Sequence, residues 1–141
     1  MTETPAPPTL AVGLGCRRGC DASTLQVLLE QSLLTHRIDL RSIKGLASID
    51  KKKVEPGLLE LAQRLNLPLV FFSAAELGAY EARLSHRSRR AFEQTGCHGI
   101  AESAALALAE QLGQGQAKLL ISRQKHPQAT FALAWTGQNP R

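Results

Sequence analysis

Residues 9–34, TLAVGLGCRRGCDASTLQVLLEQSLL, hold the pattern on which the fold prediction depends. An apolar run over residues 10–14 is bounded by glycine, which is typical of a buried strand. Leucines then recur at helical spacing, so we expect an amphipathic helix to follow. The leucines of its buried face are Leu25, Leu28, Leu29 and Leu33. The stretch therefore predicts a strand, a tight turn and a helix, the unit from which α/β domains are built.

A glycine-rich turn joins this strand to this helix, and it carries two arginines. Backbone N–H groups at the start of a helix bear partial positive charge, and guanidinium groups favour carboxylate or phosphate. We therefore expect an anion-binding site here, with the candidate residues Gly13, Gly15, Cys16, Arg17, Arg18 and Gly19. One alternative is a turn that merely requires glycine. Nicotinamide or flavin binding is disfavoured, because the spacing GxGxxxG differs from the GxGxxG fingerprint.

The rest of the chain alternates between strand and helix patterns. The expected strands are residues 10–14, 41–49, 67–72, 118–122 and 129–135, the third covered on both faces and the last two joined as a hairpin. The expected helices begin after the first turn, at Pro56, after Ser73 and at residues 99–112, the last with alanine on its buried face. Within residues 82–99 we expect a mobile loop followed by a short helix near residues 88–94. An exposed basic loop is the default interpretation of the arginines at 83–90, but they could also close over an acidic ligand.

This alternation predicts a three-layer α/β/α domain over residues 9–136, between a disordered lead-in at 1–8 and a tail at 137–141. The sheet is expected to be mixed, mostly parallel, of about five strands and closed by the antiparallel hairpin. Ligands of such sheets bind at the carboxyl ends of the strands. The additional binding candidates at these ends are Ser48, Lys51, Lys53 and Ser73, and Lys125 in the hairpin. A solvated helix start explains the lysines equally well.

Two carboxylates are candidate general bases, Asp50 after the second strand and Glu102 at the start of the alanine-rich helix. A structural role for Glu102 is the alternative, because a carboxylate there complements the helix dipole. Cys16 and Cys20 could form a metal site with Cys97 and His98, but adjacent Cys and His suit one tetrahedral ion poorly. No metal or other cofactor is therefore predicted.

Composition narrows the class of partner. Seventeen basic and twelve acidic residues give a net charge of +5, which favours anionic ligands. Aromatic residues are only 4% of the chain, whereas single-stranded nucleic-acid binders usually need stacking platforms, so nucleic acid is disfavoured. No apolar run approaches the roughly 18 residues that span a bilayer, so no membrane partner is expected. Three cysteines and no signal-peptide pattern favour the cytoplasm.

Five segments in order resemble the motifs of one family, which comprises CobE and the C-terminal domain of CbiG, proteins of cobalamin (corrin ring) biosynthesis. These segments are GLGCRRGC at 13–20, LASIDKKKVEPGLLELA at 46–62, LPLVFFSAAEL at 67–77, TGCHGIAESAALALA at 95–109 and the closing segment at 125–134. The resemblance implies a ligand of the precorrin or hydrogenobyrinic-acid type, and other corrin-pathway enzymes as possible partners.

The resemblance leaves two roles open. The favoured role is an accessory or carrier protein of the aerobic pathway that binds the peripheral carboxylates of a tetrapyrrole. The alternative is an enzyme resembling cobalt-precorrin-5A hydrolase, which opens a ring lactone with release of acetaldehyde. CbiG carries N-terminal regions that have no counterpart in this sequence, so the resemblance does not transfer the hydrolase activity as a whole.

Overall fold

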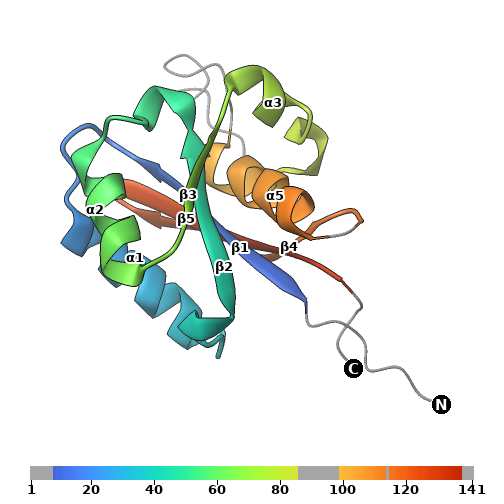
Figure 1. Ribbon diagram of the computed structural model, residues 1–141, viewed down its shortest axis with the longest axis horizontal. Coiled ribbons are helices and arrows are strands. Elements are labelled where there is room, and N and C mark those ends of the chain that lie inside the picture. Colours follow the sequence, from blue (N-terminus) through green and yellow to red (C-terminus); the bar gives the residue numbers. More distant parts are fainter. Residues whose placement is uncertain (1–7, 86–98, 114, 138–141) are drawn as a thin grey trace.

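The structure is a computed structural model that describes residues 8–85, 99–113 and 115–137. Five strands form one mixed sheet in the order β3-β2-β1-β5-β4 (Figure 1). The strands are β1 (Thr9–Cys16), β2 (Ile43–Ile49), β3 (Leu69–Phe72), β4 (Lys118–His126) and β5 (Ala129–Thr136). The first three are parallel, and β5 is antiparallel to both β1 and β4. The predicted fold class is therefore confirmed.

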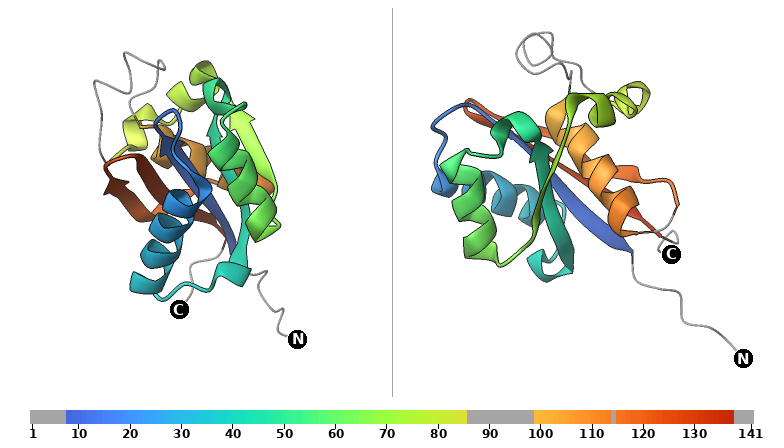
Figure 2. Two further views of the ribbon diagram at one scale, coloured as in Figure 1. Left: turned by 90° about the vertical axis from the view of Figure 1, so that its left-hand side faces the viewer. Right: turned by 45° about the horizontal axis from the view of Figure 1, so that its top comes forward.

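Helices cover both faces of the sheet, and Figures 1 and 2 show the three layers. One face packs against α1 (Ala22–Thr35) and α2 (Pro56–Leu65), whose leucines build the larger core with β1, β2 and β5. The other face packs against α5 (Ile100–Leu112) and α3 (Ala74–Gly78). Short 3-10 turns η1 (Leu40–Ser42), η2 (Asp50–Lys52) and η3 (Glu81–Arg83) complete the described elements.

Helix α5 lies unusually close to the centre of the sheet, as its alanine-rich face predicts. Ala101, Ala104 and Ala105 are each at most 1% exposed and have small side chains. They allow the helix to approach Gly13 of β1 so closely that a Cβ atom there would lie 1.8 Å from the carbonyl oxygen of Ala101. Gly13 is thus required by packing, whatever else it does.

Helix ends follow local rules. The Asp21 side chain accepts the Thr24 N–H at 2.8 Å and caps α1. Pro56 occupies the first turn of α2, as predicted. Asn66 ends α2 in the left-handed conformation with φ 55°, a conformation that asparagine tolerates better than most residues.

Two of the expected strands differ from those observed. β3 begins at Leu69, two residues later than predicted, and lies at the edge of the sheet. Leu69 and Phe71 pack against one core and Val70 and Phe72 against the other, so the expectation of cover on both faces is confirmed. The hairpin turn is also shorter than predicted, because β4 runs on to His126. The polar residues at the end of β4 are compatible with an edge strand that has one face open to water. The short helix expected at 88–94 lies outside the described residues.

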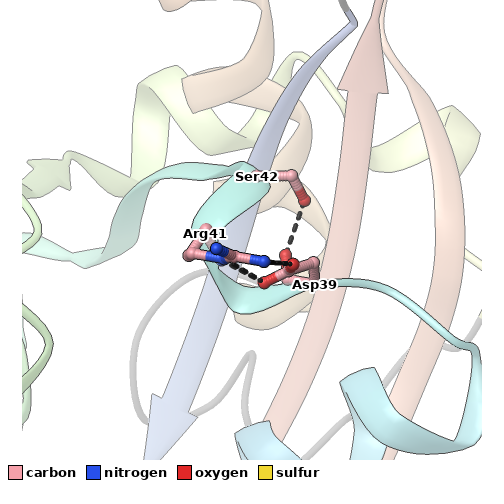
Figure 3. A network of polar contacts seen from close by, with 3 residues as sticks. All are labelled: Asp39, Arg41 and Ser42. Carbon is pink, nitrogen blue, oxygen red and sulfur yellow. Dashed lines mark hydrogen bonds and ion pairs between the residues drawn. The ribbon is translucent and has the colours of Figure 1, made fainter.

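β2 begins at Ile43, two residues later than predicted, because Leu40–Ser42 forms the turn η1. Figure 3 shows the polar contacts of this turn, in which Arg41 folds back on Asp39. The guanidinium Nη2 lies 2.8 Å from Oδ2 of Asp39, and the Ser42 hydroxyl donates to the Asp39 carbonyl at 2.6 Å. The Arg41 side chain is 90% exposed, so this ion pair contributes little to stability.

The first and last strands meet at one end of the sheet, where Thr9 pairs with Thr136. The carboxyl ends of the parallel strands β1, β2 and β3 lie at the opposite end of the sheet (Figure 1). Among the described helices, none is both long and apolar enough to cross a membrane.

Candidate functional site

The carboxyl ends of the parallel strands form one edge, and we call it the strand-end edge. It comprises the β1–α1 turn at residues 17–21, the segment 50–55 after β2, Ser73 after β3 and the β4–β5 turn. Strand register joins the hairpin to this edge, since Lys125 pairs with Thr130 and Thr130 pairs with Gly15. Within the described residues, the loops that carry the candidate ligand-binding residues therefore lie at one end of the sheet, and the predicted loop at 82–99 lies largely outside the described residues.

The β1–α1 turn has an exposed rim of positive charge. Arg17, Arg18 and Gly19 are exposed, and Gly19 has φ +82°, a conformation that glycine adopts without strain. Three backbone N–H groups of the turn already have acceptors within the protein. Arg17 N–H donates to the Gln128 carbonyl at 2.9 Å, and Cys20 N–H donates to the Arg17 carbonyl at 3.1 Å. The guanidinium side chains are thus the parts of this turn best placed to meet an anion.

The third donor reaches a residue that sequence reasoning missed. Gly19 N–H donates to Oε2 of Glu55 at 3.1 Å, and Glu55 is only 7% exposed. The two residues are 36 positions apart in sequence, so no local pattern reveals their contact. The sequence feature that could have drawn attention to Glu55 is its place directly before Pro56 and Gly57, at the start of a helix.

The lysines after β2 divide by exposure. Lys51 and Lys53 are exposed, whereas Lys52 is half-buried. Burial raises the pKa of the Cys16 thiol to about 12, and the positive charge of Lys52 opposes that rise. The electrostatic effect of Lys52 on Cys16 indicates that the segment after β2 lies beside the end of β1. Lys52 is therefore a further basic group of the strand-end edge that the candidate residues omitted.

Several candidates have clear structural roles. A Cβ atom on Gly15 would lie 2.7 Å from the Thr130 hydroxyl, so this glycine allows close strand packing. The hydroxyl of Ser48 is buried and donates to the Leu14 carbonyl at 2.7 Å. Ser73 forms a capping box with Glu76 at the start of α3. Their predicted contact with a ligand remains a prediction.

The two candidate bases differ in their surroundings. Glu102 is 1% exposed and accepts N–H bonds from Arg123 and Ser85, each at 2.8 Å, and a further bond from the Ser85 hydroxyl. These contacts hold the carboxylate inside the protein, which agrees with the structural role given above as the alternative. Asp50 is half-exposed at the start of η2, on the strand-end edge. Asp50 is therefore the better placed of the two to meet a ligand.

No metal centre is found among the described residues, since no group of three or more His, Cys, Asp or Glu side chains there could hold an ion. Cys16 and Cys20 are free thiols, the first half-buried and the second buried. Cys97 and His98, the other two residues of the disfavoured metal site, lie outside the described residues.

Comparisons with protein families, with curated proteins and with solved structures all match the same family. The family model described as "Cobalamin synthesis G C-terminus" matches residues 10–134. Protein CobE of Sinorhizobium sp is 37% identical over 132 residues, which cover 93% of this chain and 82% of that protein. The crystal structure of CobE, a protein from the cobalamin (vitamin B12) biosynthetic pathway, superimposes with a TM-score of 0.92 and 46% identity, covering 97% of both chains.

Longer relatives match over part of their length. The cobalt-precorrin-5A hydrolase of Priestia megaterium is 32% identical over 128 residues, which cover 91% of this chain but 32% of the hydrolase. The chain thus spans about a third of that relative. Because the family model and the CobE match each span most of the sequence, the chain belongs to the Cobalamin synthesis G C-terminus family and is a cobalamin biosynthesis protein of the CobE/CbiG family.

Proposed function

We propose that this protein binds a precorrin or hydrogenobyrinic-acid-type tetrapyrrole through the ligand's peripheral carboxylates, as an accessory or carrier protein of the aerobic pathway. One observation carries the proposal. Exposed cationic side chains from three segments far apart in sequence gather on the strand-end edge: Arg17 and Arg18, Lys51 and Lys53, and Lys125. A ligand with carboxylates spread around a ring would match cations spread along an edge.

The energetics are adequate for such a ligand. Corrin precursors carry acetate and propionate groups around a large apolar ring. A charge-assisted hydrogen bond contributes roughly 1.5–3 kcal/mol once it is shielded from water. Two or three of them would supply much of the about 8 kcal/mol that corresponds to micromolar affinity, before any burial of the ring.

Isothermal titration with hydrogenobyrinic acid tests the proposal. The double substitution Arg17→Ala with Arg18→Ala is expected to weaken binding at least about tenfold and to reduce its dependence on salt. Arg41→Ala with Lys44→Ala is the matched control, because it removes two exposed cations at the opposite end of the sheet. Equal affinity of the Arg17/Arg18 variant and the parent would refute the proposed edge.

The alternative proposal is a lactone hydrolase acting on the same ring, and the identity to the Priestia megaterium hydrolase favours considering it. Asp50 would then be the general base, because it is the accessible carboxylate of the two candidates. The test is turnover of a lactone-bearing cobalt-precorrin, with detection of the acetaldehyde released. Activity that is lost in Asp50→Asn but kept in Glu102→Gln would support this assignment, and absence of turnover in the parent would exclude it.

A further inference from the structure

Glu55 connects two parts of the strand-end edge. It occupies the N-cap position of α2, and its carboxylate makes no hydrogen bond to its own helix. Instead it accepts the N–H of Gly19 in the β1–α1 turn at 3.1 Å. Its own backbone N–H donates to the Lys52 carbonyl at 2.9 Å. One residue therefore contacts both the lysine segment and the arginine turn.

Close backbone packing reinforces the connection that Glu55 makes. A Cβ atom on Gly57, the second residue of α2, would lie 2.1 Å from the Cys20 carbonyl oxygen, so the helix start and the turn touch through their backbones. Arg17 N–H continues the chain of contacts to the Gln128 carbonyl in the β4–β5 turn. The three cationic segments are thus joined by contacts that meet at the turn held by Glu55.

We infer that Glu55 is a positioning residue, which holds the β1–α1 turn so that Arg17 and Arg18 lie at a fixed place beside Lys51 and Lys53. The inference rests on the proposed function and identifies the residue that organises its site. The Glu55 carboxylate accepts the Gly19 N–H, which a ligand anion could otherwise bind. Ligand anions therefore meet side chains on the rim of the turn.

Charge and position predict opposite effects on ligand affinity. If Glu55 acted only through its charge, either Glu55→Gln or Glu55→Ala would strengthen binding of a polyanion, because each removes a nearby negative charge. As a positioning residue, Glu55 can be replaced by glutamine, whose amide oxygen also accepts the Gly19 N–H. Alanine cannot replace it, and the two arginines would then have to be ordered upon binding, which weakens affinity about tenfold.

The experiment compares hydrogenobyrinic acid binding to the parent, Glu55→Ala and Glu55→Gln, with amide hydrogen exchange of residues 16–20 as a readout that needs no ligand. Glu110→Ala is the matched control. This half-buried carboxylate also accepts a backbone N–H, from Ala117 at 2.9 Å, but it lies in the last turn of α5 and not in the β1–α1 turn. We expect faster exchange and about tenfold weaker binding in Glu55→Ala alone, and partial recovery of both in the presence of formate.

Each outcome bears on the inference. Binding by Glu55→Ala as tight as that of the parent would overturn it, and so would unchanged exchange at residues 16–20. If Glu55→Ala fails to fold, Gly19→Ala perturbs the turn from the other side, because its φ of +82° strains an L-residue and nothing lies within 4 Å of the new Cβ atom. Affinity equal to the parent's in Gly19→Ala would then overturn the inference. Absence of binding by the parent removes the proposed function and this inference together.

Discussion

Replacing Gly13 with alanine should separate helix α5 from the sheet. The new Cβ atom would lie 1.8 Å from the Ala101 carbonyl oxygen and 2.6 Å from the Ala105 nitrogen. Carbon-to-oxygen contacts normally begin at about 3.3 Å, so the helix and the strand must move apart by about 1.5 Å. Both obstructing atoms belong to the helix backbone, so no rotation of a side chain can relieve the clash.

A gap of that size removes much of the contact energy between the alanine face of α5 and the sheet, because a separation of about 0.5–1 Å already forfeits a quarter to a half of each contact. We expect a loss of about 3 kcal/mol, at the upper end of the range for overpacked cores. Against a total stability of about 5–15 kcal/mol, this is a large fraction.

Urea denaturation followed by circular dichroism measures the effect of Gly13→Ala. With a slope of about 1.5 kcal/mol/M, the midpoint should fall by about 2 M. Gly78→Ala is the control, because nothing lies within 4 Å of its Cβ position, and its midpoint should stay the same or rise slightly. A Gly13→Ala midpoint within about 0.5 M of the parent would refute the packing argument.

Three further predictions concern other parts of the molecule. Burial raises the pKa of Cys16 to about 12, so iodoacetamide should alkylate this thiol roughly a thousandfold more slowly than a free cysteine at pH 7.5. The alkylation rate should still increase above pH 9. Peptide mass spectrometry measures the labelling, and rapid labelling at pH 7.5 would contradict the prediction. Burial alone would raise the pKa of Glu110, but hydrogen bonds from Ala117, Tyr80 and Arg83 lower it overall. Glu110 therefore stabilises the fold above its unfolded pKa, near 4.5, and this contribution is lost as the pH falls through its folded pKa. The free energy of unfolding of Glu110→Gln at pH 7 should be about 1–3 kcal/mol lower than that of the parent. Urea titrations at several pH values should also show that the stability of this variant depends less on acid. Asn66→Val should cost about 1–2 kcal/mol in the same assay because of the positive φ, whereas Asn66→Gly should be nearly neutral; equal midpoints for the two variants would contradict the strain argument.

The fold was predictable where local patterns decide it. The leucine spacing of α1, Pro56 at the start of α2 and the alanines of α5 each follow from the sequence over a few turns of helix. The position of a strand within the sheet is a tertiary property. The run LPLVFF correctly predicts a strand covered on both faces, but it does not reveal that β3 lies at the edge of the sheet. The polar end of β4 was taken for a loop because an edge strand facing water lacks an apolar pattern.

The candidate site was predictable as a collection of loops but not as a set of contacts. The rule that ligands gather at the carboxyl ends of parallel strands brings Arg17, Lys51 and Ser73 to one edge without knowledge of any distance. The position of Lys125 at the same edge follows only from the strand register. The contact between Gly19 and Glu55 joins distant positions, so only the folded chain reveals it. The same is true of the Arg123 and Ser85 donors that surround Glu102.

The pairing of Thr9 with Thr136 has a consequence for how this domain is used in evolution. The polypeptide enters and leaves the domain at neighbouring points, and domains with this property accept fusion and circular permutation readily. The strand-end edge lies at the far end of the sheet, so a covalent neighbour joined beside Thr9 would leave it uncovered. This geometry suits a module that occurs alone in CobE and as one third of the Priestia megaterium hydrolase.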